Sequence, residues 1–262
     1  MTATDRPVAI LRPQGVTTGA RTIATEAPVA IEVDGYGYAV MMMTPADLEP
    51  FAVGFMLTER LADTAADVIA VEPFQAETGW IVRVALSDRC RGRIHDRVRH
   101  RTSDTGCGLC GLSGLEQLRR PAPRAPRPDV RADAVFRALS SLREYQPLNR
   151  QTGAAHAAAA CTRDGSIVAA CEDVGRHNAL DKLVGARAMA REAVDGFILV
   201  SSRISFEMVD KALIARAPML VGISAPTDLA IEHAEAHGLT LLALARFDAI
   251  LAVHDPWEIF AG

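Results

Sequence analysis

Short apolar runs and one helical repeat alternate in the first third of the chain. The apolar runs predict strands, at residues 29–33, 38–43, 68–71 and 80–86. Between the first two runs lies Asp34-Gly35, a strong hairpin signal. Thr44 and Pro45 predict the N-cap and first position of a helix, whose apolar residues then recur at helical spacing up to Leu61. Residues 1–27 show no period and are expected to be irregular, ending in a short approach strand. Residues 1–102 are therefore predicted to form a small α+β domain.

Helical patterns and continuously apolar runs alternate beyond residue 131. A hairpin turned by Asp164-Gly165 is expected first, with strands at Ala155–Cys161 and Ser166–Cys171. The later segments predict helices at residues 132–145, 178–190, 206–216 and 229–237, and strands at 197–200, 219–223, 239–244 and 250–254. Short apolar strands between helices indicate a sheet covered on both faces, so residues 131–262 predict a three-layer α/β/α domain. The whole chain is thus predicted to be an α+β protein of two domains.

A glycine-rich loop with two thiols separates these predicted domains. Residues 103–114 hold Cys107 and Cys110 among four glycines, a composition typical of loops that carry chemistry. Four prolines in residues 119–128 then predict an extended linker, so residues 103–130 are expected to form a Cys loop and a linker. A lone C-x-x-C fits half a zinc site, a redox pair, or a nucleophilic thiol that carries a group.

The charge around this loop favours the reactive thiol. From Arg89 to Arg131 the chain has eleven arginines, no lysines and four acids, a charge of +7 in a chain whose total is −4. Arginine suits phosphate recognition, and a cationic surround lowers the pKa of a thiol. A solvated basic hinge is the alternative. We interpret the segment as a mobile reactive thiol beside a binding surface for an anionic ligand.

Composition excludes several classes of protein. The chain of 262 residues is 49% hydrophobic, has no apolar run of ~18 residues for a membrane helix, and does not begin like a signal peptide. Its five cysteines, an odd number, argue for free thiols rather than a disulfide framework. We therefore expect a cytoplasmic protein. Because the basic segment has no interleaved aromatic residues, nucleic-acid binding is not expected.

Polar side chains follow the predicted strands of the second domain. In open α/β sheets, ligands bind at the C-terminal strand ends, beside helix N-termini. The residues there that would suit a phosphate-bearing ligand are Arg176, His177, Ser201, Ser202, Arg203 and Ser224. Ser224 and Thr227 could instead be helix caps only. His156 is either a catalytic partner or an ordinary hairpin histidine.

Metal chemistry is the weaker reading of the remaining motifs. A zinc site from Cys107, Cys110, Cys161 and Cys171 is possible by ligand type, but the last two occupy strand ends where small buried apolar residues are common. His233-Ala234-Glu235 has the letters of a zinc deaminase motif but lacks the P-C-x-x-C that must follow it. No metal site is expected.

Several motifs together resemble those of the formate dehydrogenase accessory protein family (FdhD). They are Val40-Met41-Met42-Met43-Thr44-Pro45-Ala46-Asp47-Leu48-Glu49, Thr105-Gly106-Cys107-Gly108-Leu109-Cys110-Gly111, Thr152-Gly153-Ala154-Ala155-His156-Ala157-Ala158, Glu172-Asp173-Val174-Gly175-Arg176-His177-Asn178-Ala179-Leu180-Asp181-Lys182 and Val200-Ser201-Ser202-Arg203-Ile204-Ser205-Phe206-Glu207-Met208-Val209. The resemblance runs from Glu26 to about residue 245.

The resemblance implies a function and a mechanism. It implies a sulfurtransferase in which Cys107 receives sulfur from a cysteine desulfurase as a persulfide. The sulfur then passes to the molybdenum bis(molybdopterin guanine dinucleotide) cofactor for formate dehydrogenase, with Cys110 in a secondary role. It also implies a larger domain like the cytidine deaminase fold without its zinc ligands, a homodimer, and binding of guanine nucleotides.

One segment departs from the family pattern. After the strand at residues 239–244 the family is usually glycine-rich with a basic residue, at positions associated with the cofactor. Here the segment reads Leu244, Ala245, Arg246, Phe247, Asp248 and Ala249, which keeps one basic residue but no glycine. The alternative function is a zinc- or redox-type chaperone that only binds the cofactor or the apo-dehydrogenase.

Overall fold

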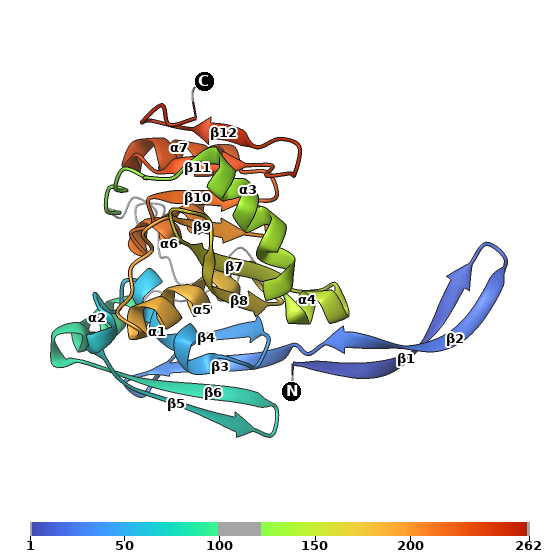
Figure 1. The fold of residues 1–262 in the computed structure, drawn as a ribbon. Coiled ribbons are helices and arrows are strands. Elements are labelled where there is room, and N and C mark those ends of the chain that lie inside the picture. Colours follow the sequence, from blue (N-terminus) through green and yellow to red (C-terminus); the bar gives the residue numbers. More distant parts are fainter. Residues whose placement is uncertain (1, 99–121, 261–262) are drawn as a thin grey trace.

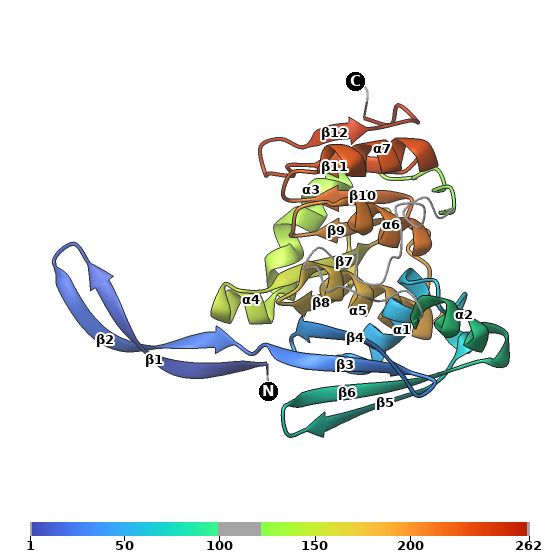
Figure 2. The same ribbon diagram turned by 180° about the vertical axis from the view of Figure 1, so that it is seen from behind.

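The computed structural model describes residues 2–98 and 122–260, which form a mixed α+β fold (Figures 1 and 2). Its larger sheet has the order β12-β11-β10-β9-β7-β8. The strands are β7 (His156–Cys161), β8 (Ile167–Asp173), β9 (Phe197–Val200), β10 (Met219–Gly222), β11 (Thr240–Ala243) and β12 (Leu251–His254). β9, β10 and β11 are mutually parallel, and β7 is antiparallel to both β8 and β9. β12 pairs antiparallel at the edge, where the sequence placed it.

Helices cover both faces of this sheet, as predicted. α5 (Arg176–Met189), α6 (Phe206–Ile214) and α7 (Asp228–His237) lie on one face, and α3 (Ala132–Ser141) lies on the other (Figure 1). Successive residues of β7 alternate between the two buried layers, since Ala158 packs on the α5 side and Ala159 on the α3 side. The short helices η3 (Leu142–Tyr145) and α4 (Pro147–Thr152) continue the α3 layer to β7, and the sequence did not predict α4.

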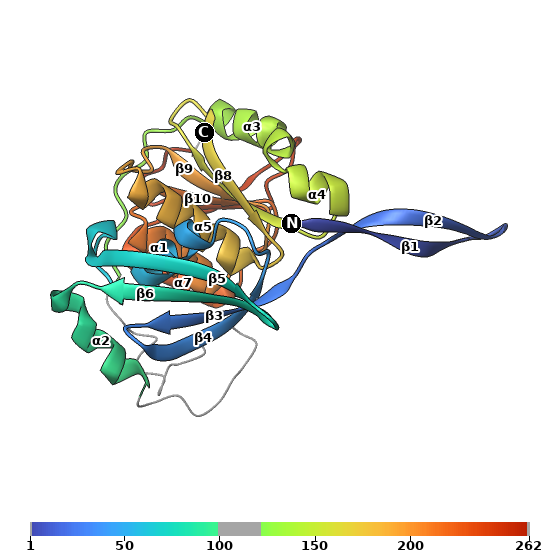
Figure 3. The same cartoon turned by 90° about the horizontal axis from the view of Figure 1, so that it is seen from below.

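The smaller sheet has the order β4-β3-β6-β5 (Figure 3). Its strands β3 (Ala27–Val33), β4 (Tyr36–Met43), β5 (Val68–Ala76) and β6 (Gly79–Leu86) match the predicted runs. The inner face of this sheet packs on α1 (Leu48–Thr58). One apolar core then continues from α1 through α5 to the larger sheet, and the division into two domains stays a prediction.

Two glycines allow α1 and α5 to cross in backbone contact. A Cβ added at Gly54 would lie 1.8 Å from the carbonyl oxygen of Asp181, and one at Gly185 would lie 1.8 Å from that of Pro50. No side chain fits in such a gap. The crossing holds α5 against α1, and the first turn of α5 belongs to the candidate site.

The irregular structure predicted for residues 1–27 is wrong for residues 3–24. They form an antiparallel hairpin of β1 (Ala3–Arg12) and β2 (Gly15–Ala24) that extends away from the rest of the protein (Figures 1 and 2). Nearly all its residues are exposed, so neither face is buried and no apolar alternation marks the strands in the sequence.

Two further predictions need correction. The N-cap of α1 is Asp47, not Thr44. Thr44 is instead a buried residue that contacts the end of β8. Its backbone N–H donates to the Asp173 carboxylate, and its hydroxyl accepts from the N–H of Val174. Part of the basic segment forms the helix α2 (Asp88–Val98), which the sequence did not predict. The short helix η1 (Ala65–Asp67) lies earlier in the chain, directly before β5. Residues 122–131 form no helix or strand, as their prolines predict.

Across the part of the chain that the structure describes, no helix combines the length and apolar character needed to span a bilayer.

Candidate functional site

The polar segments predicted from the sequence meet at one edge of the larger sheet. β8, β9, β10 and β11 all end at this edge, and β7 begins there, because His156 pairs with Asp173 and Ala158 with Val200. Backbone hydrogen bonds join the turns that follow: the N–H of Ile223 donates to Val200 O, and that of Leu244 donates to Ser224 O. The predicted convergence of these segments is therefore confirmed.

Most of the motif at residues 172–182 builds this edge rather than offering free groups. The Glu172 carboxylate accepts from the N–H groups of Leu148 and Asn149 and so caps α4. Buried Asp173 lies 2.7 Å from the Nζ of buried Lys182. Its carboxylate also accepts from the N–H of Gly175 and the side chain of Asn178, which holds the start of α5 in place.

A second buried ion pair supports the neighbouring helix. The Nζ of Lys211 on α6 lies 2.8 Å from both carboxylate oxygens of Asp181 on α5. The hydroxyl of Thr58, at the end of α1, donates to the same carboxylate and accepts from Lys211. α1, α5 and α6 are thus joined by satisfied charges just below the candidate site.

Near these ion pairs lie five side chains with few hydrogen-bond partners. We call them the open polar cluster: His156, Arg176, His177, Ser205 and Glu207. They come from the start of β7, the first turn of α5 and the first turn of α6. Arg176 Nε, His177 Nδ1 and Ser205 Oγ are buried yet have no hydrogen-bond partner among the described residues. Ser205 is the N-cap of α6 but makes no capping hydrogen bond. Buried polar atoms are normally paired, so this arrangement is typical of a binding site.

Burial dominates the electrostatics of the open polar cluster. It lowers the pKa of His177 to about 3, with help from the positive charges of Lys211 and Arg176. It raises the pKa of Glu207 to about 7, against the opposing effect of Lys211. The pKa of half-buried His156 is lowered, first by burial and then by Arg176. At neutral pH the cluster therefore offers neutral imidazoles, one guanidinium and a carboxyl group that gains or loses a proton easily.

The remaining predicted hydroxyls are mostly structural. Ser201 Oγ accepts from the N–H of Ala157, and Ser202 Oγ donates to Arg203 O. Arg203 is exposed at the same edge, so its guanidinium is available to a ligand. The N-cap of α7 is Thr227, although its side chain makes no capping hydrogen bond, and Ser224 lies half-buried before it.

The segment that departs from the family pattern forms a turn beside Ser224. Leu244 has a positive φ of 48°, and Ala245 is buried with its N–H donating to Gly222 O. Arg246, Phe247 and Asp248 are exposed, with Phe247 78% accessible. The turn therefore presents side chains at the edge of the candidate site.

The described arginines of α2 are paired with acids of the chain, and the prediction that the basic segment receives an anion stays a prediction. Arg89 binds both carboxylate oxygens of Asp67, and Arg93 binds both of Asp63, at 2.8 and 2.7 Å. Arg91 lies 3.2 Å from Asp88. The other arginines from Arg97 to Arg120 lie outside the residues whose side chains the structure describes.

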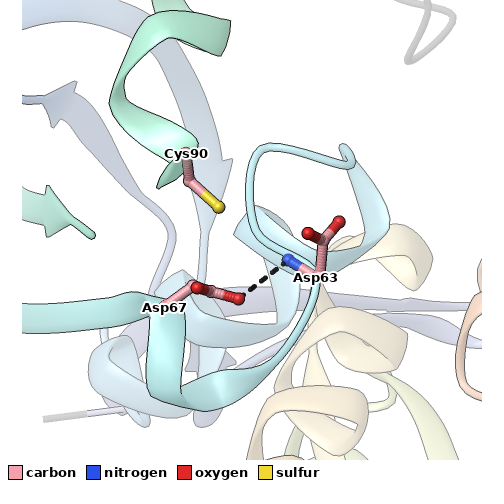
Figure 4. A group of neighbouring side chains, drawn as sticks. All are labelled: Asp63, Asp67 and Cys90. Carbon is pink, nitrogen blue, oxygen red and sulfur yellow. Dashed lines mark hydrogen bonds between the residues drawn. The ribbon is translucent and has the colours of Figure 1, made fainter. Parts of the chain in front are cut away.

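Asp63, Asp67 and buried Cys90 form a group with metal-ligand chemistry, as Figure 4 shows. Their ligand atoms lie within 4.8 Å of one another. However, Asp67 also accepts from Ser87 Oγ and Thr64 Oγ1, and its hydrogen bonds from Arg89 hold its pKa far below the usual range. We call Asp63, Asp67, Arg89, Arg93 and Cys90 the ion-pair cluster. Its carboxylates are neutralised by protein groups, so it has the character of a structural feature.

The described cysteines do not support a four-cysteine zinc site. Cys161 belongs to the core layer on the α3 side of the sheet, whereas Cys171 packs against the layer on the α5 side. Burial raises the pKa of Cys161 to about 12 and that of Cys171 to about 11, so both stay protonated. Zinc needs thiolates on one centre, and these two thiols are on opposite faces of the sheet. Cys107 and Cys110 lie outside the described residues.

Comparison with solved structures shows the class of fold. The chain is similar to a crystal structure described as a formate dehydrogenase accessory protein from Desulfotalea psychrophila, with a TM-score of 0.78 and 23% identity over 98% of both chains. The likeness to the cytidine deaminase fold stays a prediction.

Comparison with sequences shows the family. The sequence model of the FdhD/NarQ family matches residues 24–259. The chain is 43% identical to the sulfur carrier protein FdhD of Variovorax paradoxus, over 90% of this chain and 86% of that protein. It is 44% identical to the sulfur carrier protein FdhD of Bordetella petrii, over 94% and 91%. The chain therefore belongs to the FdhD/NarQ family.

Two residues of the open polar cluster were not predicted from the sequence. Ser205 and Glu207 stand in the same motif as Ser201 and Arg203, but the motif alone did not separate structural positions from free ones. The available signal was position, because both residues fall in the first turn of a helix that begins at the ligand-binding edge.

Proposed function

We propose that the protein is a sulfur carrier for the maturation of formate dehydrogenase. The observation that carries this proposal is the similarity, over about nine-tenths of the chain, to proteins named as sulfur carriers. The open polar cluster adds support, because buried polar atoms without partners at the end of a parallel sheet suit a bound anionic molecule.

The loading step would occur at Cys107. Its thiolate attacks the outer sulfur of a persulfide on a cysteine desulfurase, a new S–S bond forms at Cys107, and the cysteine of the desulfurase leaves as a thiolate. No net oxidation occurs in this exchange. Cys110, three residues away, would have a secondary role.

The delivery step would take the molybdenum bis(molybdopterin guanine dinucleotide) cofactor as substrate. The bond between Cys107 and its outer sulfur breaks, and Cys107 returns to a thiolate. The transferred sulfur becomes sulfide, and the two electrons that it gains come from a reduced molybdenum centre. In this proposal Arg176 and the helix N-termini bind the guanine nucleotide phosphates, with Arg203 and Arg246 at the rim.

Mass spectrometry tests the carrier function. Incubation with a cysteine desulfurase and cysteine should add about 32 Da to the peptide that contains Cys107, the mass of one sulfur. Cys107→Ser should abolish this addition and the activation of formate dehydrogenase, while Cys110→Ser should still be loaded. If Cys107→Ser still activates the dehydrogenase, the protein is instead a chaperone of the zinc or redox type, and metal analysis would identify the former.

Calorimetry tests the proposed placement of the nucleotide. Arg203→Ala should weaken the binding of guanosine diphosphate about tenfold, since a charged hydrogen bond contributes roughly 1.5–3 kcal/mol. Arg216→Ala is the matched control, because Arg216 is an exposed arginine beyond the opposite end of the same helix. Equal binding by the wild type and both variants would contradict the placement.

We further propose that two copies pair through the outer face of the smaller sheet, in the cytoplasm. This face carries a row of apolar side chains across its strands: Pro28, Ala30, Val40, Met42, Phe74 and Ile81. In this row Val40 and Met42, both on β4, are 68% and 51% exposed. Exposed apolar patches of this kind are typical of protein–protein contact surfaces. A monomeric mass by light scattering would exclude this pairing.

A further inference from the structure

Glu207 and His177 lie at ion-pair distance without a hydrogen bond between them. Oε2 of Glu207 lies 3.1 Å from Nδ1 of His177, but the two atoms do not form a hydrogen bond. The two side chains are 16% and 17% exposed, so solvent satisfies little of either group. They come from the first turns of adjacent helices, α6 and α5.

The nearby cations do not compensate Glu207 fully. Lys211 is held by both oxygens of Asp181 and by Thr58. The guanidinium of Arg176 keeps a buried Nε without a partner in the described chain. Among the described residues, the charged or titratable groups that act on this pair are Glu59, His156, Arg176, Asp181 and Lys211.

We propose that Glu207, held against His177, takes up one proton from solvent when an anionic phosphate group binds beside Arg176. This inference rests on the proposed function and concerns the phosphates of the guanine nucleotide. Under this proposal Glu207 is a positioning residue: the phosphate binds when the Glu207 carboxyl is protonated and is repelled when the carboxyl is ionised.

Coulomb repulsion gives the physical reason. A phosphate close to Arg176 and the helix N-termini would face the Glu207 carboxylate across a poorly solvated site, where like charges repel strongly. Protonation of Glu207 removes this repulsion. The pKa of Glu207, raised to about 7 by burial, makes that proton easy to gain near neutral pH. The pKa of His177, lowered to about 3, directs the proton to Glu207 instead.

Titration calorimetry with guanosine diphosphate tests the proposal. Measured between pH 7 and 8.5 in two buffers of different ionisation enthalpy, proton uptake by the wild type should rise from about half a proton per nucleotide at pH 7 to close to one at pH 8.5, and its affinity should fall roughly fivefold from pH 7 to 8 and more steeply above. Glu207→Gln imitates the protonated carboxyl, so its affinity should hardly change over this range. Glu232→Gln, at an exposed position on α7, should behave as the wild type does.

Three outcomes would overturn the proposal. The first is a wild type that takes up no proton, a result that needs no variant to fold. The second is that the Glu207→Gln variant takes up as many protons on nucleotide binding as the wild type does, because the proton would then belong to the nucleotide or to another residue. The third is equal proton uptake with guanosine, which has no phosphate. Sulfur loading of Cys107 is measured separately by mass, so the carrier function can stand or fall independently.

Discussion

Two clusters of charged and polar side chains lie in this protein, and they differ in how completely they are satisfied. In the ion-pair cluster, both carboxylates are bound by arginines, and Asp67 accepts from two hydroxyls as well. In the open polar cluster, three buried polar atoms have no partner among the described residues, and two groups have strongly shifted pKa values. The first cluster is satisfied by groups of the chain itself, whereas the second keeps buried polar atoms that no described residue satisfies.

Whether polar groups are already paired within the chain separates structural from functional residues better than residue type does. By composition, Asp63, Asp67 and Cys90 are the better metal ligands, and the arginines beside them are the better phosphate ligands. Each of those groups is already used by its neighbours. Buried polar atoms without partners also occur elsewhere in the described chain, but the open polar cluster combines three of them with two groups of strongly shifted pKa at the ends of the strands, so it is the functional candidate.

The largest expected effect comes from opening the closed cluster. Asp67→Asn removes the charge that binds Arg89 and should lower the free energy of unfolding by about 2–3 kcal/mol at pH 7. Asp88→Asn is the control, because this acid is exposed and should change stability by less than about 0.5 kcal/mol. Urea unfolding measures both. Guanosine diphosphate binding should be unchanged in Asp67→Asn.

The pH dependence gives this prediction a sign. Arg89, followed by Ser87 and Thr64, holds the pKa of Asp67 far below its usual range in the folded chain. The resulting stability is present in full above the unfolded pKa of about 4 and is lost as pH falls toward the folded pKa. The difference between the wild type and Asp67→Asn should therefore shrink below about pH 4. A difference that grows in acid would contradict the assignment.

Glu207→Gln should show the opposite pattern, with a smaller effect. The pKa of Glu207 is raised in the folded chain to about 7, chiefly by burial, so its ionisation opposes folding. Wild-type stability is thus fully present below the unfolded pKa of about 4.5 and is lost as pH rises through 7. At pH 8 the free energy of unfolding of Glu207→Gln should exceed that of the wild type by about 2 kcal/mol, and at pH 5 by less than about 1 kcal/mol. Lower stability of the variant at pH 8 would show that the carboxylate has a structural partner.

Periodic burial explains which parts of the fold could be predicted. β9 was predicted at its observed bounds, and α5, α6 and α7 within about two residues, because each has a buried face that imposes a pattern on the sequence. The hairpin of β1 and β2 was missed since it buries neither face. The start of α1 was misplaced because Thr44 bonds to Asp173, a residue 129 positions away in sequence.

The candidate site was predictable in place but not in membership. Topology brings the strand ends together, so Arg176, His177 and Arg203 could be located from the sequence. Which polar side chains remain unpaired depends on contacts between distant residues. Asp181 and Lys211 neutralise each other only because α5 and α6 pack side by side, and that packing leaves Glu207 only partly compensated.

The smallest effects come from one serine that donates to the ion-pair cluster and one serine of the open polar cluster. Ser87 Oγ donates to Asp67 Oδ1 at 2.9 Å, so Ser87→Ala should lower the free energy of unfolding by about 1 kcal/mol and leave nucleotide binding unchanged. Ser205 Oγ is buried without a partner in the described residues, so Ser205→Ala should change stability by less than about 0.5 kcal/mol. Its affinity for guanosine diphosphate should nevertheless fall several-fold, because the hydroxyl is free to bind the ligand. Urea unfolding and calorimetry on both variants give four values. If Ser205→Ala is as destabilising as Ser87→Ala and binds the nucleotide normally, Ser205 is a structural residue and the distinction between the two clusters fails at that position.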